Sequence, residues 1–252
     1  ISLLKFDPTI KSILKMNDDI NIDSSIIKII SDLSNHTLLT KLMSVIPLPD
    51  LDLEALLTNI RSSVLLNISK IQFTSDILSF QSALALQCFI NEYLYKESDE
   101  ETLALKRLEH SIDLTFSKNL QPEPFILLCL ASYRPLHTYD WSQSISLPNQ
   151  FQNVSKTLIH DFFKEKKLSS EMPMLDEIID EVSSNVRQQY EQNPYPKWTD
   201  LKSNYEPLTI SELVKKLKLK LTNDVINTVI CPDILIAGCG TGKQSINAAS
   251  NY

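Results

Sequence analysis

Residues 233–242 read Asp-Ile-Leu-Ile-Ala-Gly-Cys-Gly-Thr-Gly, and this stretch decides the class of fold that the end of the chain is predicted to adopt. A short β-branched and leucine run that leads directly into glycine is typical of a buried parallel strand followed by a tight turn. Residues 243–249 can then form a helix whose N-terminus faces the turn. Unpaired backbone N–H groups at such a helix end attract an anion or a polar ligand head. The stretch therefore predicts a strand, a turn and a helix that bind a nucleotide-like cofactor.

The chain contains three glycines, Gly238, Gly240 and Gly242, and all of them fall in this turn. Glycine adopts positive φ angles and lets a ligand approach bare backbone. A region that joins its elements with proline, serine and asparagine instead is most easily built from helices. We therefore expect a mainly α chain with a helical domain over 1–170, connecting helices and a linker over 171–230, and the start of an α/β Rossmann-like domain over 231–252.

Apolar residues recur at three- and four-residue spacing, which predicts helices ahead of the turn. Residues 26–43 and 53–65 each have a one-sided apolar stripe, and Asp50 can cap the second segment. A segment that opens at Ser75 or Asp76 is apolar nearly all round, so it is expected to be central. Further helices are predicted after a capping box of Ser98 and Glu101, where Leu103, Leu105, Leu108 and Ile112 form a stripe, after Pro122 and Pro124, over 149–166 and 173–190, and after a second box of Thr209 and Glu212 that continues to Leu221.

The last predicted helix carries lysines mostly on one face, at Lys215, Lys216, Lys218 and Lys220. This face is either the solvated surface of a packed helix or a contact for an acidic partner. No firm internal repeat has the period of about 34 residues that is typical of tetratricopeptide repeats. Degenerate helix pairs remain an open alternative for the helical region.

Composition and charge limit the classes of function. A net charge of −7 argues against nucleic acid as the main partner. No apolar run approaches the roughly 18 to 20 residues that span a bilayer, and the first residues do not have the order of a signal peptide, so a cytoplasmic location without membrane contact is expected. The four cysteines and four histidines are dispersed, which predicts reduced thiols and no metal site. Because the chain begins at Ile1 and ends at Tyr252, soon after the glycines, we expect a fragment.

Three cofactor classes compete for the glycine turn. The dinucleotide pattern G-x-G-x-x-G is not met, because the third glycine comes one residue early and Lys243 takes its place. A relaxed P-loop pattern runs from Ala237 to Lys243, but Gln244 stands where a Ser or Thr should reach magnesium. The pattern G-x-G-x-G directly after a predicted strand is fully met. NAD is therefore disfavoured as the cofactor, and G-x-G-x-G is a better match than the P-loop pattern.

Residues 234–242, Ile-Leu-Ile-Ala-Gly-Cys-Gly-Thr-Gly, resemble the first motif of class I S-adenosylmethionine-dependent methyltransferases. Residues 186–198, Val-Arg-Gln-Gln-Tyr-Glu-Gln-Asn-Pro-Tyr-Pro-Lys-Trp, are similar to a segment ahead of the methyltransferase domain in bacterial proteins that join it to tetratricopeptide-type helices. Residues 85–93, Ala-Leu-Gln-Cys-Phe-Ile-Asn-Glu-Tyr, look like part of the helical region of that group. The resemblance thus covers three separate segments of the chain.

The resemblance implies that S-adenosylmethionine is the cofactor and that the turn lies beneath it. The cofactor-binding residues that it implies are Gly238, Cys239, Gly240, Thr241 and Gly242. Many members of the family place an acid two positions before the first glycine, where this chain has Ile236. The acid's contact with the amino end of the cofactor would therefore be lost, or would be supplied through water or by Asp233. The family's acid for the ribose hydroxyls would lie beyond Tyr252.

The segment from Tyr190 through Tyr195 to Trp198 has two interpretations. As a lid it would fold over the cofactor, since proline restricts the backbone and the aromatic rings offer apolar faces with polar edges. Alternatively its rings dock an interdomain linker.

Methyl transfer requires mainly orientation and exclusion of water, because the cofactor already carries the activated group. The catalytic residues are left unknown, and the resemblance implies that any acid–base residues would lie beyond Tyr252. The helical region would recruit or shape an acceptor, which the sequence leaves open among protein, metabolite and glycan, and the fragment itself is expected to be inactive. The alternatives are a helical protein-interaction module and a P-loop nucleotide hydrolase.

Overall fold

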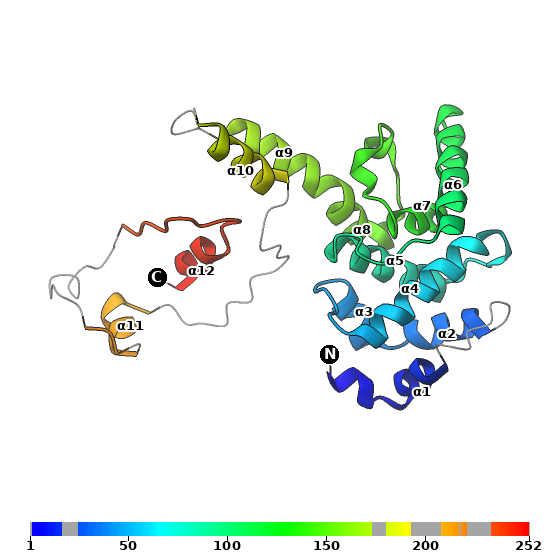
Figure 1. Cartoon of the computed structure of the whole chain (residues 1–252), viewed down its shortest axis with the longest axis horizontal. Coiled ribbons are helices and arrows are strands. Elements are labelled where there is room, and N and C mark those ends of the chain that lie inside the picture. Colours follow the sequence, from blue (N-terminus) through cyan, green and yellow to red (C-terminus); the bar gives the residue numbers. More distant parts are fainter. Residues whose placement is uncertain are drawn as a thin grey trace. The chain divides into compact units, whose positions relative to one another are not determined.

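The computed structural model describes residues 2–16, 25–172, 180–192, 208–216, 218–220 and 233–251. The chain divides into two units, Ile1–Pro173 and Met174–Tyr252. Over the described ranges the regular elements are helices and no strand is present (Figure 1). The prediction of a mainly α chain is thus confirmed. Within the same ranges no helix has the length and apolar character needed to cross a bilayer.

The helical unit, as we call the first unit, consists of α-helices joined by short 3₁₀ turns. Its elements are η1 (Ser2–Phe6), α1 (Pro8–Met16), α2 (Ser25–Ser34), α3 (Thr37–Met43), α4 (Leu51–Leu66), η3 (Ile68–Lys70), α5 (Ser75–Ile90), α6 (Asp99–Ser117), α7 (Pro124–Ala131), η4 (Leu136–Thr138), η5 (Ser142–Ser144), η6 (Asn149–Phe151), α8 (Gln152–Ser155), the π-helical turn η7 (Lys156–His160) and α9 (Asp161–Glu171). The second unit contains α10 (Glu181–Gln192), α11 (Ile210–Lys216) and α12 (Lys243–Asn251).

Helix α5 is the centre of the helical unit, as predicted from its apolar composition. It packs against α2, α3 and α7. Side chains on different sides of the helix, among them Phe80, Ala85 and Leu86, are buried. The helix begins at Ser75, and its N-cap is Thr74, whose hydroxyl accepts a hydrogen bond from the backbone N–H of Ile77. The helix start predicted at Ser75 or Asp76 is therefore confirmed.

The predicted helix caps are present in the structure. The Asp50 carboxylate accepts hydrogen bonds from the backbone N–H groups of Asp52 and Leu53 at the start of α4. Ser98 and Glu101 form a reciprocal capping box on α6. Thr209 and Glu212 make the same exchange at the start of α11, with 2.8 Å from the Thr209 N–H to the Glu212 carboxylate.

Several predicted helices differ from the structure in their limits. The stripe over 26–43 is divided between α2 and α3, because the His36 side chain caps a new helix by accepting from the Leu39 N–H. The helix predicted over 149–166 contains a π-helical turn and continues to Glu171. The apolar stripe predicted for the helix that is now α6 was wrong at Leu103, which is 55% exposed. The other predicted members, Leu105, Leu108 and Ile112, are buried.

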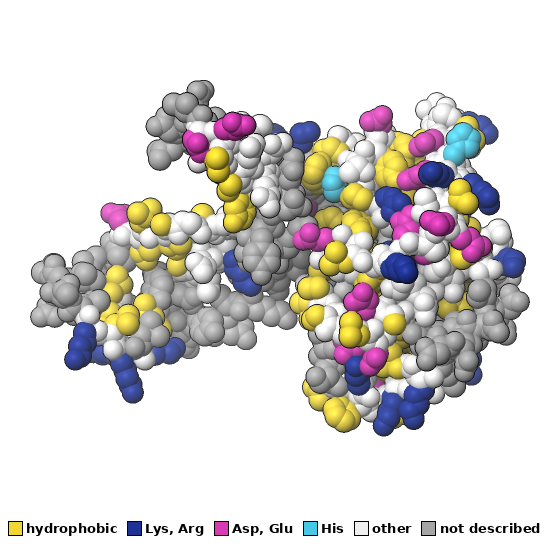
Figure 2. Space-filling view, viewed as in Figure 1, with side chains coloured by type: hydrophobic (Ala, Val, Ile, Leu, Met, Phe, Trp, Pro, Cys, Tyr) yellow, Lys and Arg dark blue, Asp and Glu magenta, His cyan; other side chains and the backbone are white. Residues whose placement is uncertain are grey.

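In the second unit, α10 begins at Glu181, and residues 173–179 lie outside the described part of the chain. Helix α11 ends at Lys216, and the positive φ of Lys218 is incompatible with a continuous helix at that residue, so the predicted extension to Leu221 is wrong there. Leu217 and Leu221 themselves lie outside the described residues. Lysine side chains do gather at α11 (Figure 2).

Arg61 of α4 is a buried cation at the junction of three segments, with 2% of its surface exposed. Its guanidinium donates to the carbonyl oxygens of Lys96 at 2.7 Å, Tyr95 at 3.2 Å and Ser132 at 3.4 Å. It also lies 4.1 Å from the ring centroid of Tyr133. The Tyr133 hydroxyl donates to the buried Glu101 carboxylate at 2.5 Å. The tyrosine therefore contacts both the buried guanidinium of Arg61 and the buried carboxyl group of Glu101.

The segment Tyr133–Trp141 lies along α6, and its side chains form hydrogen bonds with successive acidic residues of that helix. Arg134 pairs with Glu97 just before the helix at 2.7 Å. Further along, the Tyr139 hydroxyl donates to Glu109 and the Trp141 indole N–H donates to Asp113 at 2.6 Å. Glu109 and Asp113 are four residues apart and so share one face of α6. Their two hydrogen bonds therefore set how the segment is aligned along the helix.

Candidate functional site

The glycine turn has an unusual backbone, since all three of its glycines have positive φ. The angles are 64° at Gly238, 54° at Gly240 and 79° at Gly242, whereas Cys239 and Thr241 do not have positive φ. The sign of φ therefore alternates over five residues. Such alternation places successive backbone N–H groups on one side, in the arrangement of anion-binding nests.

Backbone hydrogen bonds fix this turn to the helix that follows. The Gly242 N–H donates to the Cys239 carbonyl at 3.0 Å, which closes the turn. The Gly242 carbonyl accepts from the Ile246 N–H at 2.9 Å, the first bond of α12. The turn thus ends at the N-terminus of a helix, where the positive end of the helix dipole lies.

The space beside the turn is open. A Cβ added at Gly238 or at Gly242 would have no heavy atom within 4 Å. The requirement for glycine comes therefore from the backbone, because a left-handed residue with a Cβ costs roughly 1–2 kcal/mol. The same open space is available to a ligand that approaches the bare backbone.

The strand predicted over 233–236 is not confirmed. These residues form no regular element, and Leu235 is 93% exposed. A parallel strand needs a neighbour that pairs its N–H and C=O groups, and the described residues contain none. The helix predicted after the turn is present as α12.

The structure brings five of the predicted site residues together, in the consecutive segment 238–242. Tyr190 lies on α10, another helix of the second unit, and is 64% exposed. Tyr195 and Trp198 lie outside the described residues, so the lid and the linker interpretations both stay predictions.

The alternative acid, Asp233, is exposed, and the side chain of Ile236 is partly exposed. Their effect on the cofactor's amino end also stays a prediction.

The cysteines give no evidence of a second reactive site in the described chain. Cys88 and Cys129 are buried free thiols, and burial raises the pKa of each to about 12. They are therefore protonated and unreactive near neutral pH. Cys239 in the glycine turn is exposed, and Cys231 is not described. Among the described residues no group of three potential metal ligands is present.

No family model, curated protein or solved structure matches this chain.

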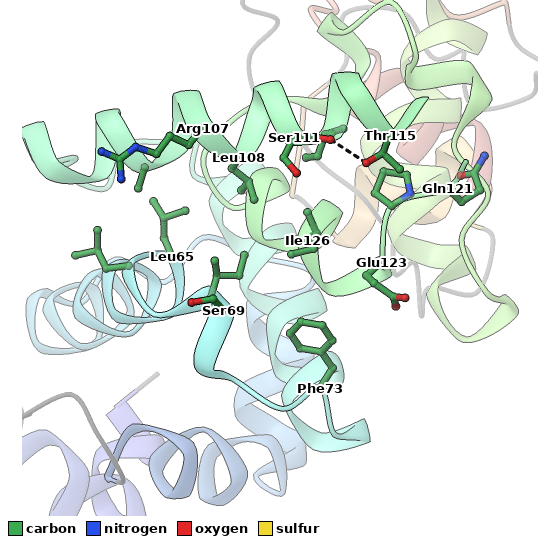
Figure 3. A pocket seen from close by; sticks show the side chains of 15 residues that line it. Leu65, Ser69, Phe73, Arg107, Leu108, Ser111, Thr115, Gln121, Glu123 and Ile126 are labelled. Atoms are coloured by element: carbon green, nitrogen blue, oxygen red, sulfur yellow. Dashed lines mark hydrogen bonds between the residues drawn. The ribbon is translucent and has the colours of Figure 1, made fainter. Parts of the chain in front are cut away.

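Sequence reasoning did not find a groove in the helical unit. The α6 groove, as we call it, has a volume of about 650 Å³ and lies between the end of α4, one face of α6 and the start of α7 (Figure 3). Its lining includes Leu65, Phe73, Leu108, Ile112 and Ile126, so its surface is mainly apolar.

Small polar residues leave the space that forms the α6 groove. Ser111 and Thr115 continue the lining along α6, where a longer apolar residue would fill the gap. Gln121 closes one end by bonding the backbone of Ser144 and Ser146. The change from leucine to serine and threonine along α6 is the one sequence signal for this groove.

Proposed function

We propose that the glycine turn binds S-adenosylmethionine and that the protein is a methyltransferase. The observation that carries the proposal is the positive φ at all three glycines of the G-x-G-x-G pattern, directly before α12. This backbone presents N–H groups to the carboxylate of an amino-acid moiety, and the open space beside Gly238 and Gly242 admits the ligand.

The bound cofactor would supply an activated methyl group on sulfur. The residues of the turn would hold and orient it through their backbone, with no side chain needed as a nucleophile. In this proposal the helical unit recruits or shapes the acceptor, which is a protein, a metabolite or a glycan.

A P-loop hydrolase is the second candidate, because Lys243 begins α12 and could approach a phosphate. Against it, Gln244 occupies the position of the magnesium-binding hydroxyl. The two candidates bind different ligands and are separated by one calorimetric experiment. The protein at its natural length is titrated with S-adenosylmethionine and, separately, with magnesium-ATP. Micromolar binding of the first alone supports the proposal, whereas binding of ATP alone would replace it.

The Gly242→Val variant tests whether the turn itself is the site. Valine at a φ of 79° is strained, and its branches enter the space that the ligand would take. We expect the affinity for S-adenosylmethionine to fall roughly 5- to 30-fold, because holding valine in the left-handed backbone that binds the ligand costs roughly 1–2 kcal/mol. Ala249→Val, on the exposed surface of α12, is the matched control and should bind as the parent does. Unchanged affinity of Gly242→Val would exclude the turn as the cofactor site.

A further inference from the structure

The α6 groove is a second candidate site, in the helical unit and independent of the glycine turn. Its apolar surface is contributed by α4, α6, α7 and the segment Ile68–Phe73, all of them within the helical unit. Along α6 it extends from Ala104 to Thr115, which is about 16 Å at the rise of an α-helix. Three turns of a bound helix have the same length.

The charges at the groove are unpaired and of opposite sign. Arg107 lies near one end and Glu123 near the other, and both are exposed (Figure 3). In the described part of the chain neither of them forms an ion pair or a side-chain hydrogen bond. Glu123 precedes α7 as its N-cap residue, but its side chain accepts no capping bond. An apolar groove with a free cation at one end and a free anion at the other is complementary to an apolar segment that carries the opposite charges.

We propose that the α6 groove binds an amphipathic helix of a partner protein. The helix would place apolar residues at i, i+3, i+4 and i+7 against Leu108, Ile112 and Phe73. An acidic residue near one of its ends would pair with Arg107, and a basic residue near the other end would pair with Glu123. A second copy of this chain is a poorer occupant, because each copy carries a net charge of −7 and the copies repel one another.

Three labelled helical peptides of about 14 residues test the proposal. They share one leucine face and differ in the charges at their ends: one has a lysine and a glutamate, one has two lysines, and one has two glutamates. Fluorescence anisotropy with the parent protein should rank the mixed peptide first.

Charge reversal should change this ranking in opposite directions. Arg107→Glu makes both ends of the groove acidic, so the two-lysine peptide should then bind best. Glu123→Lys makes both ends basic, so the two-glutamate peptide should bind best. Each mismatched end should lower affinity about threefold, as expected for an exposed ion pair. Lys106→Glu reverses an exposed charge on α6 outside the groove and is the matched control that should keep the parent's ranking.

A steric variant separates the groove from the charges. Ser111→Trp should fill the groove and weaken all three peptides at least tenfold, while Ser117→Trp, on α6 outside the groove, should not. Circular dichroism of each variant confirms that the helices are retained. The proposal is overturned if no peptide binds the parent at millimolar concentration, if Ser111→Trp binds as the parent does, or if the ranking ignores the charge reversals. Self-association of the parent that Ser111→Trp abolishes would instead identify a second copy as the occupant.

Discussion

Replacing Arg61 should destabilise the helical unit strongly, because this side chain connects α4 to the segments before α6 and after α7. Arg61 donates to the carbonyl oxygens of Lys96 and Tyr95 at 2.7 and 3.2 Å. Hydrogen bonds from a charged group contribute about 1.5–3 kcal/mol each. The Tyr133 ring at 4.1 Å adds about 2 kcal/mol in a desolvated setting. Methionine removes the cost of keeping a cation buried and retains much of the apolar stem, so the net effect is smaller than the sum of these contacts. We expect Arg61→Met to lower the free energy of unfolding by about 3–5 kcal/mol.

The assay is urea denaturation followed by the fluorescence of Trp141, which bonds Asp113 inside this unit. A Trp198→Phe background leaves Trp141 as the single tryptophan of the chain. Arg61→Lys serves as a milder variant, since it keeps the charge but loses the planar fork, and it should cost about 1–2 kcal/mol. Arg107→Met, on the exposed surface of α6, should change stability by less than about 0.5 kcal/mol.

A double-mutant cycle tests the link through Tyr133. Burial and the hydrogen bond to Glu101 both raise the pKa of Tyr133, so its hydroxyl remains a donor. Arg61 lies over the ring of the same tyrosine, so removing it should also weaken the contact between Tyr133 and Glu101. In a Glu101→Gln background the same Arg61→Met change should therefore cost less, by at least about 1 kcal/mol. A loss below about 1 kcal/mol for Arg61→Met, or a cycle without coupling, would refute the reasoning.

Two further predictions concern protonation and reactivity. The hydrogen bond from Arg134 lowers the pKa of Glu97, so its stabilising effect is present above the unfolded pKa and is lost as pH falls through the lower folded pKa. The urea midpoint of Glu97→Gln should therefore fall less between neutral pH and about pH 3 than that of the parent or of the control Glu165→Gln; equal slopes would contradict this. Iodoacetamide should modify Cys239 in the native protein but neither Cys88 nor Cys129, whose buried thiols have a pKa of about 12. Peptide mass spectrometry distinguishes the sites, and native labelling of Cys88 would refute the predicted core.

Local signals in the sequence predicted the helices and their caps well. Asp50, Ser98 and Thr209 each act within three residues of their own position, so spacing alone identifies their hydrogen bonds. The central place of α5 also follows from composition, because a helix that is apolar all round has to be enclosed. The glycine turn is predictable for the same reason, since positive φ is a property of single residues.

Interactions between distant segments were not predictable in this way. Arg61 bonds residues 34 and 71 positions away, and no local pattern distinguishes it from a surface arginine. The division between α2 and α3 was missed because histidine is an uncommon cap, while serine, threonine, aspartate and asparagine are the usual ones. The strand over 233–236 depends on a neighbouring strand, and its own residues cannot provide that partner.

The buried polar contacts and the α6 groove belong to one arrangement. The groove walls are the end of α4, one face of α6 and the start of α7, and two of these helices also make buried polar contacts, through Arg61 on α4 and Glu101 on α6. Arg61 lies one turn before Leu65 of the groove and donates to carbonyl oxygens of Lys96, before α6, and Ser132, after α7. Tyr133, which follows α7, is joined to α6 by its hydrogen bond to Glu101. Directional bonds fix the separation of helices more narrowly than apolar contacts, which tolerate sliding. Arg61→Lys should therefore weaken the mixed peptide more than its modest loss of stability would suggest, because it would change the width of the groove while the helices remain folded.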